Sequence, residues 1–217
     1  MKTRNKFILE GNNIYFFSDA HRNHSNILKM SNRGHSTVEE MNTWLDENIW
    51  GKLEPGDILF DLGDTFWKTD DNTIENILKK VPEDVQLWKI MGNHDAYGLY
   101  YSDQSPIAEY YCGISDILDI TIRYKSIDYM ITLCHYPMVS WNHKPYGSFM
   151  LHGHCHGNID DFNNQTPDLR LDVGVDGALC QYLGKPMLEF RDILQYFENK
   201  VGGDNFINYV KNNKYNL

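Results

Sequence analysis

Three apolar runs in the first half of the chain are each followed by side chains that can bind metal ions. These side chains are Asp19 and His21 after residues 14–18, Asp64 after residues 58–62, and Asn93 and His94 after residues 85–90. Such short apolar runs are typical of buried strands, and the ligand sites of α/β proteins gather at the carboxyl ends of strands. The three segments therefore predict one shared polar site at one edge of a sheet.

The second half of the chain supplies three more histidines of the same kind. They are His135 after the apolar run 129–133, and His154 and His156 in the segment 153–156. His154 and His156 lie two residues apart, as Asp19 and His21 do, and extended backbone points such a pair to the same side. Mixed carboxylate and imidazole ligands favour Mn, Fe, Zn or Co over Ca or a redox copper site.

The elements that position these residues alternate between strand and helix in the first half, and the second half is rich in strands. We expect helices at 37–50, 72–80 and 188–197, and strands at 14–18, 58–62, 85–90, 117–123, 129–133, 149–151 and 169–173. A capping box of Ser36 with Glu39, or of Thr37 with Glu40, marks the start of the first helix. A polar turn separates the strands 117–123 and 129–133, which predicts an antiparallel pair. Sheet packed on sheet with helices outside accommodates both halves, so we expect a single α/β domain over residues 1–217.

Composition and charge restrict the class of protein and of ligand. The 217 residues are 41% hydrophobic and 23% charged, and the formal net charge is −10. No basic tract is visible, which argues against a grip on long nucleic acid and favours a small phosphorylated partner. The four cysteines form no CxxC pair, the first ten residues hold only a short apolar patch at 7–9, and no apolar run approaches the ~20 residues of a membrane span. We therefore expect a cytoplasmic protein that does not enter the membrane.

The polar segments resemble, in order, the five signature blocks of the calcineurin-like metallophosphoesterase family: DxH, GD, GNH[DE], a lone H, and GHxH. In this chain the blocks are Asp19-Ala20-His21, Gly63-Asp64, Gly92-Asn93-His94-Asp95, His135 and Gly153-His154-Cys155-His156. Segments 135–137, 140–142 and 171–176 also look like those of small bacterial and phage phosphoesterases of this superfamily. The resemblance implies a four-layer α/β/β/α sandwich and a hydrolase that acts on phosphoric mono- or diester bonds.

The resemblance also implies a role for each matching residue. One divalent metal ion would be held by Asp19, His21 and His156, a second by Asn93, His135 and His154, and Asp64 would bridge the two. Manganese is the favoured ion. His94 resembles the general acid that protonates the departing oxygen, which contributes ~10²–10⁴-fold. Asp95 would orient or tune His94, and helix capping is the alternative role for Asp95.

One departure from the family concerns substrate binding. Protein Ser/Thr phosphatases continue their second block with a phosphate-binding Arg, but here the block continues as Thr65-Phe66-Trp67-Lys68. Protein phosphatase activity is therefore not expected. His24 and Arg33, which lie just beyond the first block, are candidates to bind the substrate together with Asn93.

Some assignments keep alternatives from the sequence. A small phosphodiester or nucleotide is the expected substrate, with a nuclease acting on DNA or RNA, or a non-catalytic interaction module of the same fold, as rivals. Asp61 is either structural or a support for the ligands, and His152 is expected to pack within its strand. Tyr136 and Trp141 are either core residues or part of the pocket wall.

Overall fold

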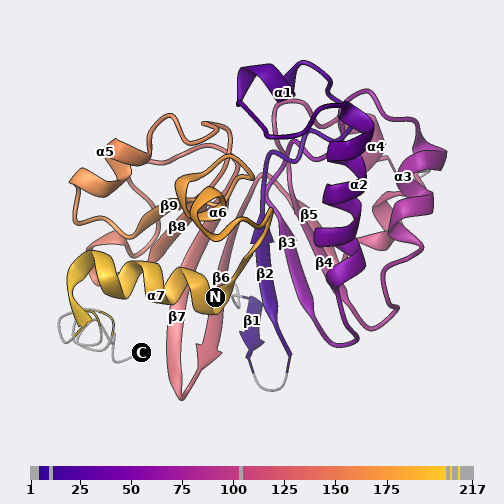
Figure 1. Ribbon diagram of the computed structural model, residues 1–217. Helices are drawn as coiled ribbons and strands as arrows, with labels where there is room; N and C mark the ends of the chain where they lie inside the picture. Colours follow the sequence, from indigo (N-terminus) through magenta and orange to yellow (C-terminus); the bar gives the residue numbers. More distant parts are fainter. Residues whose placement is uncertain (1–4, 10–11, 103–104, 204–205, 207–209, 211–217) are drawn as a thin grey trace.

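A computed structural model describes residues 5–9, 12–102, 105–203, 206 and 210 (Figure 1). Its strands are β1 (Asn5–Ile8), β2 (Ile14–Phe17), β3 (Ile58–Asp61), β4 (Gln86–Ile90), β5 (Gly113–Ser115), β6 (Ile117–Tyr124), β7 (Ile127–Cys134), β8 (Phe149–His152), β9 (Arg170–Asp172) and β10 (Leu188–Glu189). Its α-helices are α1 (Ile27–Met30), α2 (Val38–Asn48), α3 (Asp71–Leu78), α4 (Tyr97–Tyr100), α5 (Asp160–Gln165), α6 (Ala178–Leu183) and α7 (Phe190–Val201). Short 3-10 helices cover Trp50–Lys52, Ala108–Tyr110 and Lys144–Tyr146.

The described strands form two mixed sheets of five strands each. The first sheet has the order β1-β6-β7-β8-β9, and the second has the order β10-β2-β3-β4-β5. In the second sheet β2, β3, β4 and β5 run parallel to one another, while β10 is antiparallel to β2. In the first sheet only the β6–β7 pair is antiparallel. Parallel pairing brings the carboxyl ends of β2, β3 and β4 to one edge, and those of β7, β8 and β9 to one edge of the other sheet.

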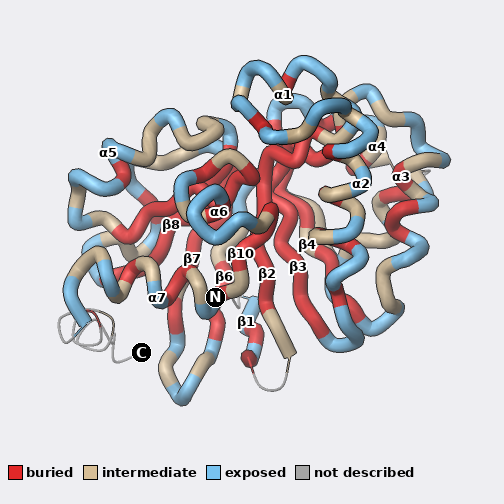
Figure 2. The backbone as a smooth tube through the Cα atoms, viewed as in Figure 1, coloured by how far each residue is buried: buried red, intermediate tan, exposed pale blue. Residues whose placement is uncertain are grey.

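The two faces of the second sheet belong to two different hydrophobic clusters. Phe16 of β2 packs in a cluster that also contains inward-facing side chains of β6, β7, β8 and β9. Its neighbours Tyr15 and Phe17 point to the opposite face, as the period of two along a strand requires, and join a cluster with Met41 and Leu45 of α2. The sheets therefore share one core, and helices cover the other face of the second sheet (Figures 1 and 2).

Local signals explain where the main helices begin. Thr37 is the N-cap of α2, and its side-chain oxygen accepts the backbone N–H of Glu40 at 3.1 Å. The Glu40 carboxylate reaches one residue further back, to the backbone N–H of Ser36 at 2.8 Å. Of the two predicted capping pairs, the structure therefore uses Thr37 and Glu40.

Most predicted elements are present, and the mixed α/β class is confirmed. The strands around residues 117–123 and 129–133 do form an antiparallel pair. The helix expected at 188–197 was placed too early, because Leu188 and Glu189 pair with β2 as β10 and the helix begins at Phe190. Within the described ranges, no helix combines the length and apolar character that a bilayer crossing requires.

Candidate metal centre

The seven expected metal ligands all lie in loops at the carboxyl ends of strands. These are Asp19 and His21 after β2, Asp64 after β3, Asn93 after β4, His135 after β7, and His154 and His156 after β8. The two sheets are joined at this end, where Ser18 forms a parallel bridge with Gly174 and the N–H of Val175 donates to the carbonyl of Ser18 at 3.0 Å. The ligands of both sheets therefore meet at one place.

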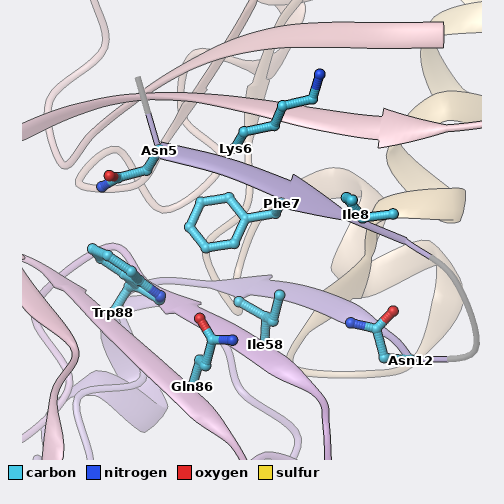
Figure 3. A pocket seen from close by; sticks show the side chains of 8 residues that line it. All are labelled: Asn5, Lys6, Phe7, Ile8, Asn12, Ile58, Gln86 and Trp88. Carbon is cyan, nitrogen blue, oxygen red and sulfur yellow. The ribbon is translucent and has the colours of Figure 1, made fainter. Parts of the chain in front are cut away.

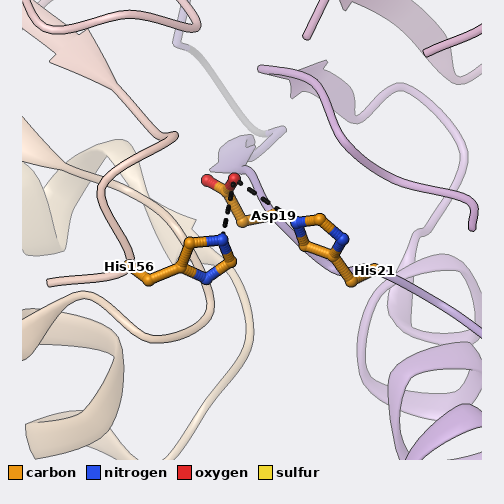
Figure 4. A group of neighbouring side chains, drawn as sticks. All are labelled: Asp19, His21 and His156. Atoms are coloured by element: carbon orange, nitrogen blue, oxygen red, sulfur yellow. Dashed lines mark ion pairs between the residues drawn. The ribbon is translucent and has the colours of Figure 1, made fainter. Parts of the chain in front are cut away.

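The first group consists of Asp19, His21 and His156 (Figure 4). Asp19 Oδ1 lies 3.9 Å from His21 Nε2 and 3.7 Å from His156 Nε2. Asp19 and His21 are buried, and His156 comes from the other sheet. One carboxylate oxygen and two imidazole nitrogens thus face a common point.

The second group surrounds the side-chain oxygen of Asn93. Asn93 Oδ1 lies 3.1 Å from His135 Nε2 and 2.8 Å from His154 Nδ1. Asp64 lies between the two groups, because its Oδ2 is 3.7 Å from His21 Nε2 and 3.4 Å from His135 Nε2. All seven predicted ligands are therefore brought together.

Unpaired buried atoms show that the first group fits a cation. Asp19 Oδ1 and His21 Nε2 are buried and have no hydrogen-bond partner among the described residues. Leaving such groups unsatisfied is unfavourable by ~1–3 kcal/mol each, more for a charge. Carboxylate and imidazole donors at this separation could hold a divalent ion such as Mn or Zn.

The environment shifts the protonation of these ligands. Burial raises the pKa of Asp19 to about 7 and lowers the pKa of His21 to about 3. Burial would also raise the pKa of Asp64, but the hydrogen bond and charge of His135, together with the N–H of His94, bring it down to about 2. Asp64 therefore remains a carboxylate, while Asp19 is favoured as an anion only when positive charge is close.

His94 lies at the exposed mouth of the cluster. Its backbone N–H donates to Asp64 Oδ1 at 2.8 Å, and its ring centroid lies 5.5 Å from that of His21. The ring of Trp67 packs edge-on against the ring of His94, with 4.7 Å between the centroids. The ring of His24 stacks on the same Trp67 ring, with 3.9 Å between the centroids. His24 thus lies beside the cluster, where the sequence placed it.

Asp95 makes buried contacts that were not predicted. Its buried Oδ2 accepts the backbone N–H groups of Asp64 at 3.0 Å and Gly92 at 2.8 Å, and it lies 3.0 Å from Lys89 Nζ. The following helix α4 has Ala96 as its N-cap and no side-chain cap. Asp95 therefore ties two ligand loops together and does not cap α4.

The guanidinium of Arg33 lies next to the first ligand loop, and all of its N–H groups have partners within the protein. Its guanidinium binds both oxygens of Asp176 at 2.9 Å and donates to the carbonyls of Asp19 and Ala20 and to the sulfur of Met41. These contacts use all five of its N–H groups. Arg33 thus supports the first ligand loop and offers no free donor to a substrate, contrary to the prediction that it binds one.

Asp176 is a residue of the cluster that the sequence reasoning missed. Its Oδ2 lies 2.7 Å from His156 Nδ1, so it fixes the ring whose Nε2 faces Asp19. A carboxylate behind a ligand histidine is a common support of metal sites. Its segment 171–176 was noted as a family-like stretch, but no role was assigned to it.

Three further residues can now be placed. Tyr136 is half exposed and its ring lies 4.7 Å from that of His154, so it borders the centre. Trp141 is buried in a small cluster with Cys134 and Met150 and is a core residue. His152 is buried within β8, where it contacts Asn163, as expected for a packed strand histidine.

A hollow of about 370 Å³ lies at the other end of the strands (Figure 3). It is bordered by β1 and by Ile58 and Gln86, which begin β3 and β4, with Phe7 and Trp88 facing into it. None of the seven expected ligands lines it. This hollow is therefore separate from the polar cluster at the carboxyl ends.

The chain is thus a mixed α/β protein whose strand ends carry a cluster of carboxylate and histidine side chains that could hold a metal ion. No family model matches the chain. The chain is 32% identical over 175 residues to the uncharacterized protein MJ1445 of Methanocaldococcus jannaschii. The aligned region covers 78% of this chain and 84% of that protein. It therefore belongs to the same family as MJ1445.

A solved structure has a similar fold. This is the protein of unknown function AQ665 from Aquifex aeolicus, with a TM-score of 0.60 and 22% identity, covering 86% of this chain and 100% of that chain. At this level of identity the likeness concerns the fold alone.

Proposed function

We propose that this protein is a calcineurin-like metallophosphoesterase that hydrolyses a small phosphate ester with two divalent metal ions. One observation carries the proposal. Asp64 Oδ2 faces an imidazole nitrogen of each ligand group, His21 Nε2 at 3.7 Å and His135 Nε2 at 3.4 Å. A single carboxylate oxygen shared by two histidine sets is the arrangement expected of a bridging ligand in a two-metal site.

The remaining features support the same proposal. In it, Asp19, His21 and His156 hold one ion, and Asn93, His135 and His154 hold the other. When bound, the two ions would reduce the negative charge of the ester and activate water for attack. We also propose that the two sheets and their helices form the four-layer α/β/β/α sandwich of that superfamily.

The chain's own residues supply the other functions. His94, exposed at the mouth and bordered by Trp67, donates a proton to the departing oxygen. Asn93 and His154 are exposed on the same side, so the ester can approach there. His24 lines the wall on the side of the first ion and contacts the substrate.

A small phosphodiester or nucleotide is the substrate that this centre fits best. The guanidinium of Arg33 is occupied by Asp176 and two carbonyls, so it adds no positive charge for a dianionic monoester. The net charge of −10 opposes the binding of long nucleic acid. The first point favours a monoanionic diester over a dianionic monoester, and the second favours a small substrate over a long nucleic acid.

A metal-supplemented activity screen tests the proposal. Metal-free protein is loaded with Mn, Fe, Zn or Co and assayed on bis-p-nitrophenyl phosphate, p-nitrophenyl phosphate, cyclic nucleotides and oligonucleotides. We expect hydrolysis of small diesters, with Mn the favoured ion. Asp64→Asn should weaken the binding of both metal ions. His94→Ala should leave metal binding unchanged and slow turnover by ~10²–10⁴-fold for esters with poor leaving groups.

Two outcomes would contradict the proposal. Protein that binds none of these ions and hydrolyses none of these esters would be an interaction module. Equal rates for the wild type and His94→Ala on an alkyl ester would remove the acid assignment.

A further inference from the structure

A lysine is completely buried directly beneath the candidate metal centre. Lys89 of β4 lies opposite Asp61 of β3, and its side chain is 0% exposed. Its Nζ lies 3.0 Å from Asp61 Oδ2, 3.0 Å from Asp95 Oδ2 and 2.9 Å from Thr65 Oγ1. The ammonium thus has three oxygen partners, and the Tyr100 ring lies 4.9 Å from it.

The two carboxylates that Lys89 joins hold the backbone around Asp64. Asp61 Oδ1 accepts the N–H of Gly63 at 2.9 Å. Asp95 Oδ2 accepts the N–H of Asp64 itself and that of Gly92 in the neighbouring loop. Lys89 is therefore linked, through one carboxylate in each case, to the backbone N–H groups of Gly63 and of Asp64, the expected bridging ligand.

The loops that contain Asp64 and Gly92 are in close contact, with no space for an additional atom between them. A Cβ at Gly92 would lie 2.2 Å from Asp64 Oδ1, so the loops pass each other at van der Waals contact. A small shift of either loop would move Asp64 Oδ2 away from His21 or His135. Three charges fixed in the interior resist such a shift, because their geometry is set by several strong hydrogen bonds.

Stability alone gives no reason to retain this cluster. Removing two carboxylates and an ammonium from water is unfavourable by several kcal/mol per ion, and apolar residues of similar volume are often as stable or more stable. We propose that Lys89, together with Asp61 and Asp95, is a positioning cluster that holds Asp64 where it reaches both metal ions. This inference rests on the proposed function.

Metal titration of a charge-neutral variant tests the inference. Lys89→Met alone would leave two buried carboxylates unpaired, so the test uses Asp61→Asn/Lys89→Met/Asp95→Asn, whose amide oxygens can still accept the loop N–H groups. Calorimetric titration with Mn²⁺ should show both ions bound about 10–100-fold more weakly than in the wild type, as for other residues that orient metal ligands. Amide hydrogen exchange at Asp64 and Gly92 should also accelerate in the metal-free protein.

A matched control separates positioning from general destabilisation. Lys200 is a partly buried lysine, and it donates to the carbonyls of Asn163 and Asp168, neither of which is an expected ligand. Lys200→Met should lower stability but leave both Mn²⁺ affinities unchanged. If the triple variant does not fold, Thr65→Val is the alternative, because it removes one partner of Lys89 with little change of shape. This variant should also lower the affinity for both Mn²⁺ ions.

The possible results distinguish the two proposals. A wild type that binds no metal ion overturns the proposed function. A wild type that binds two ions, with a folded variant of the Lys89 cluster that binds them equally well, overturns only the positioning role.

Discussion

Most of the expected ligands adopt a backbone conformation that is unusual for residues other than glycine. Five of the seven have positive φ, namely Asp19 (55°), His21 (46°), Asp64 (55°), His154 (68°) and His156 (47°). Such residues store of order 1–3 kcal/mol of strain each, and they persist only where surrounding contacts hold them. Backbone bonds such as Asp19 N–H to Gly63 and His21 N–H to Asp64, both at 2.9 Å, supply that support. The strain is thus concentrated in the residues that form the cluster.

Gly153 gives a sharp test at the scale of one residue. A Cβ there would lie 2.0 Å from Ser18 Oγ and 2.2 Å from Asp19 Oδ2. Gly153→Ala must therefore displace the Asp19 carboxylate, and calorimetry should show Mn²⁺ affinity reduced by about tenfold or more. Gly98→Ala is the control, because nothing lies within 4 Å of its added Cβ. Unchanged affinity in a folded Gly153→Ala protein would mean that Asp19 is not a ligand.

Trp67 should control how well His94 works as an acid. Its ring packs against His94 at 4.7 Å and against His24 at 3.9 Å, so removing it frees both imidazoles. We expect Trp67→Ala to lower kcat/KM about tenfold on alkyl esters and much less on p-nitrophenyl esters, which need no acid. Trp67→Phe should recover most of the loss. A uniform loss over all leaving groups would show that Trp67 affects binding and not proton transfer.

At the scale of elements, the register of the parallel strands decides which loops meet. Phe17 is paired with Asp61, and Asp61 with Lys89, so β2, β3 and β4 reach the same edge in step. In the other sheet, β7 and β8 are paired through Leu133 and Leu151. A shift of one residue in any of these pairs would turn the side chains that precede a ligand loop to the other face.

The start of α2 offers a test in which stability and metal binding separate. Thr37→Ala removes the acceptor for the N–H of Glu40. Helix caps of this kind contribute about 1 kcal/mol, so urea denaturation should show a loss of that size in the free energy of unfolding. The affinity for Mn²⁺ should not change, because α2 packs on the face of the sheet and supplies no ligand. A large drop in metal affinity would instead mean that α2 positions the first ligand loop.

At the scale of the whole molecule, each ligand group takes residues from both sheets. His156 of the first group follows β8, whereas Asp19 and His21 follow β2 of the other sheet. Metal ions bound here would therefore join the sheets, and any ligand that binds only the folded state raises its stability.

This link makes stability depend on pH in a defined direction. Burial raises the pKa of Asp19 to about 7, and the carboxylates facing His135 and His156 raise their pKa values despite burial. All three groups hold protons more tightly in the folded state, so each makes the metal-free protein lose stability as pH rises: Asp19 from its ordinary pKa of 3.8 until the pH passes about 7, and the two histidines above 6.5. Histidines whose pKa is lowered by burial, such as His21, act in the opposite direction up to the ordinary histidine pKa of 6.5, and they are neutral in both states only well above it.

Thermal unfolding checks that prediction. The Tm of metal-free protein should fall as pH rises above about 7, and added Mn²⁺ should raise Tm more at the higher pH, since the ion replaces the protons. Asp19→Asn should show a smaller fall and a smaller response to Mn²⁺. A metal-free Tm that rises over this interval would contradict the assigned directions.

The seven clustered residues and the order of the main elements were predictable from the sequence alone. Apolar runs that end in Asp, Asn or His are local patterns, and so are the capping signals of α2 and the turn between β6 and β7. These features depend on residues close together in the chain, so they can be identified without coordinates. They predicted the seven clustered residues and the mixed α/β class.

The contacts that support the clustered residues could be identified only once the chain was folded. Arg33 binds Asp176 across 143 positions of sequence, Asp95 binds the loop of Asp64, and Lys89 joins two carboxylates from inside the sheet. The short pairing of Leu188 with β2, which replaces the start of a helix, is another such case. The physical reason is the same throughout: a charged side chain or a short strand takes its role from partners that are distant in the chain, and only the packing of two sheets brings those partners within bonding distance.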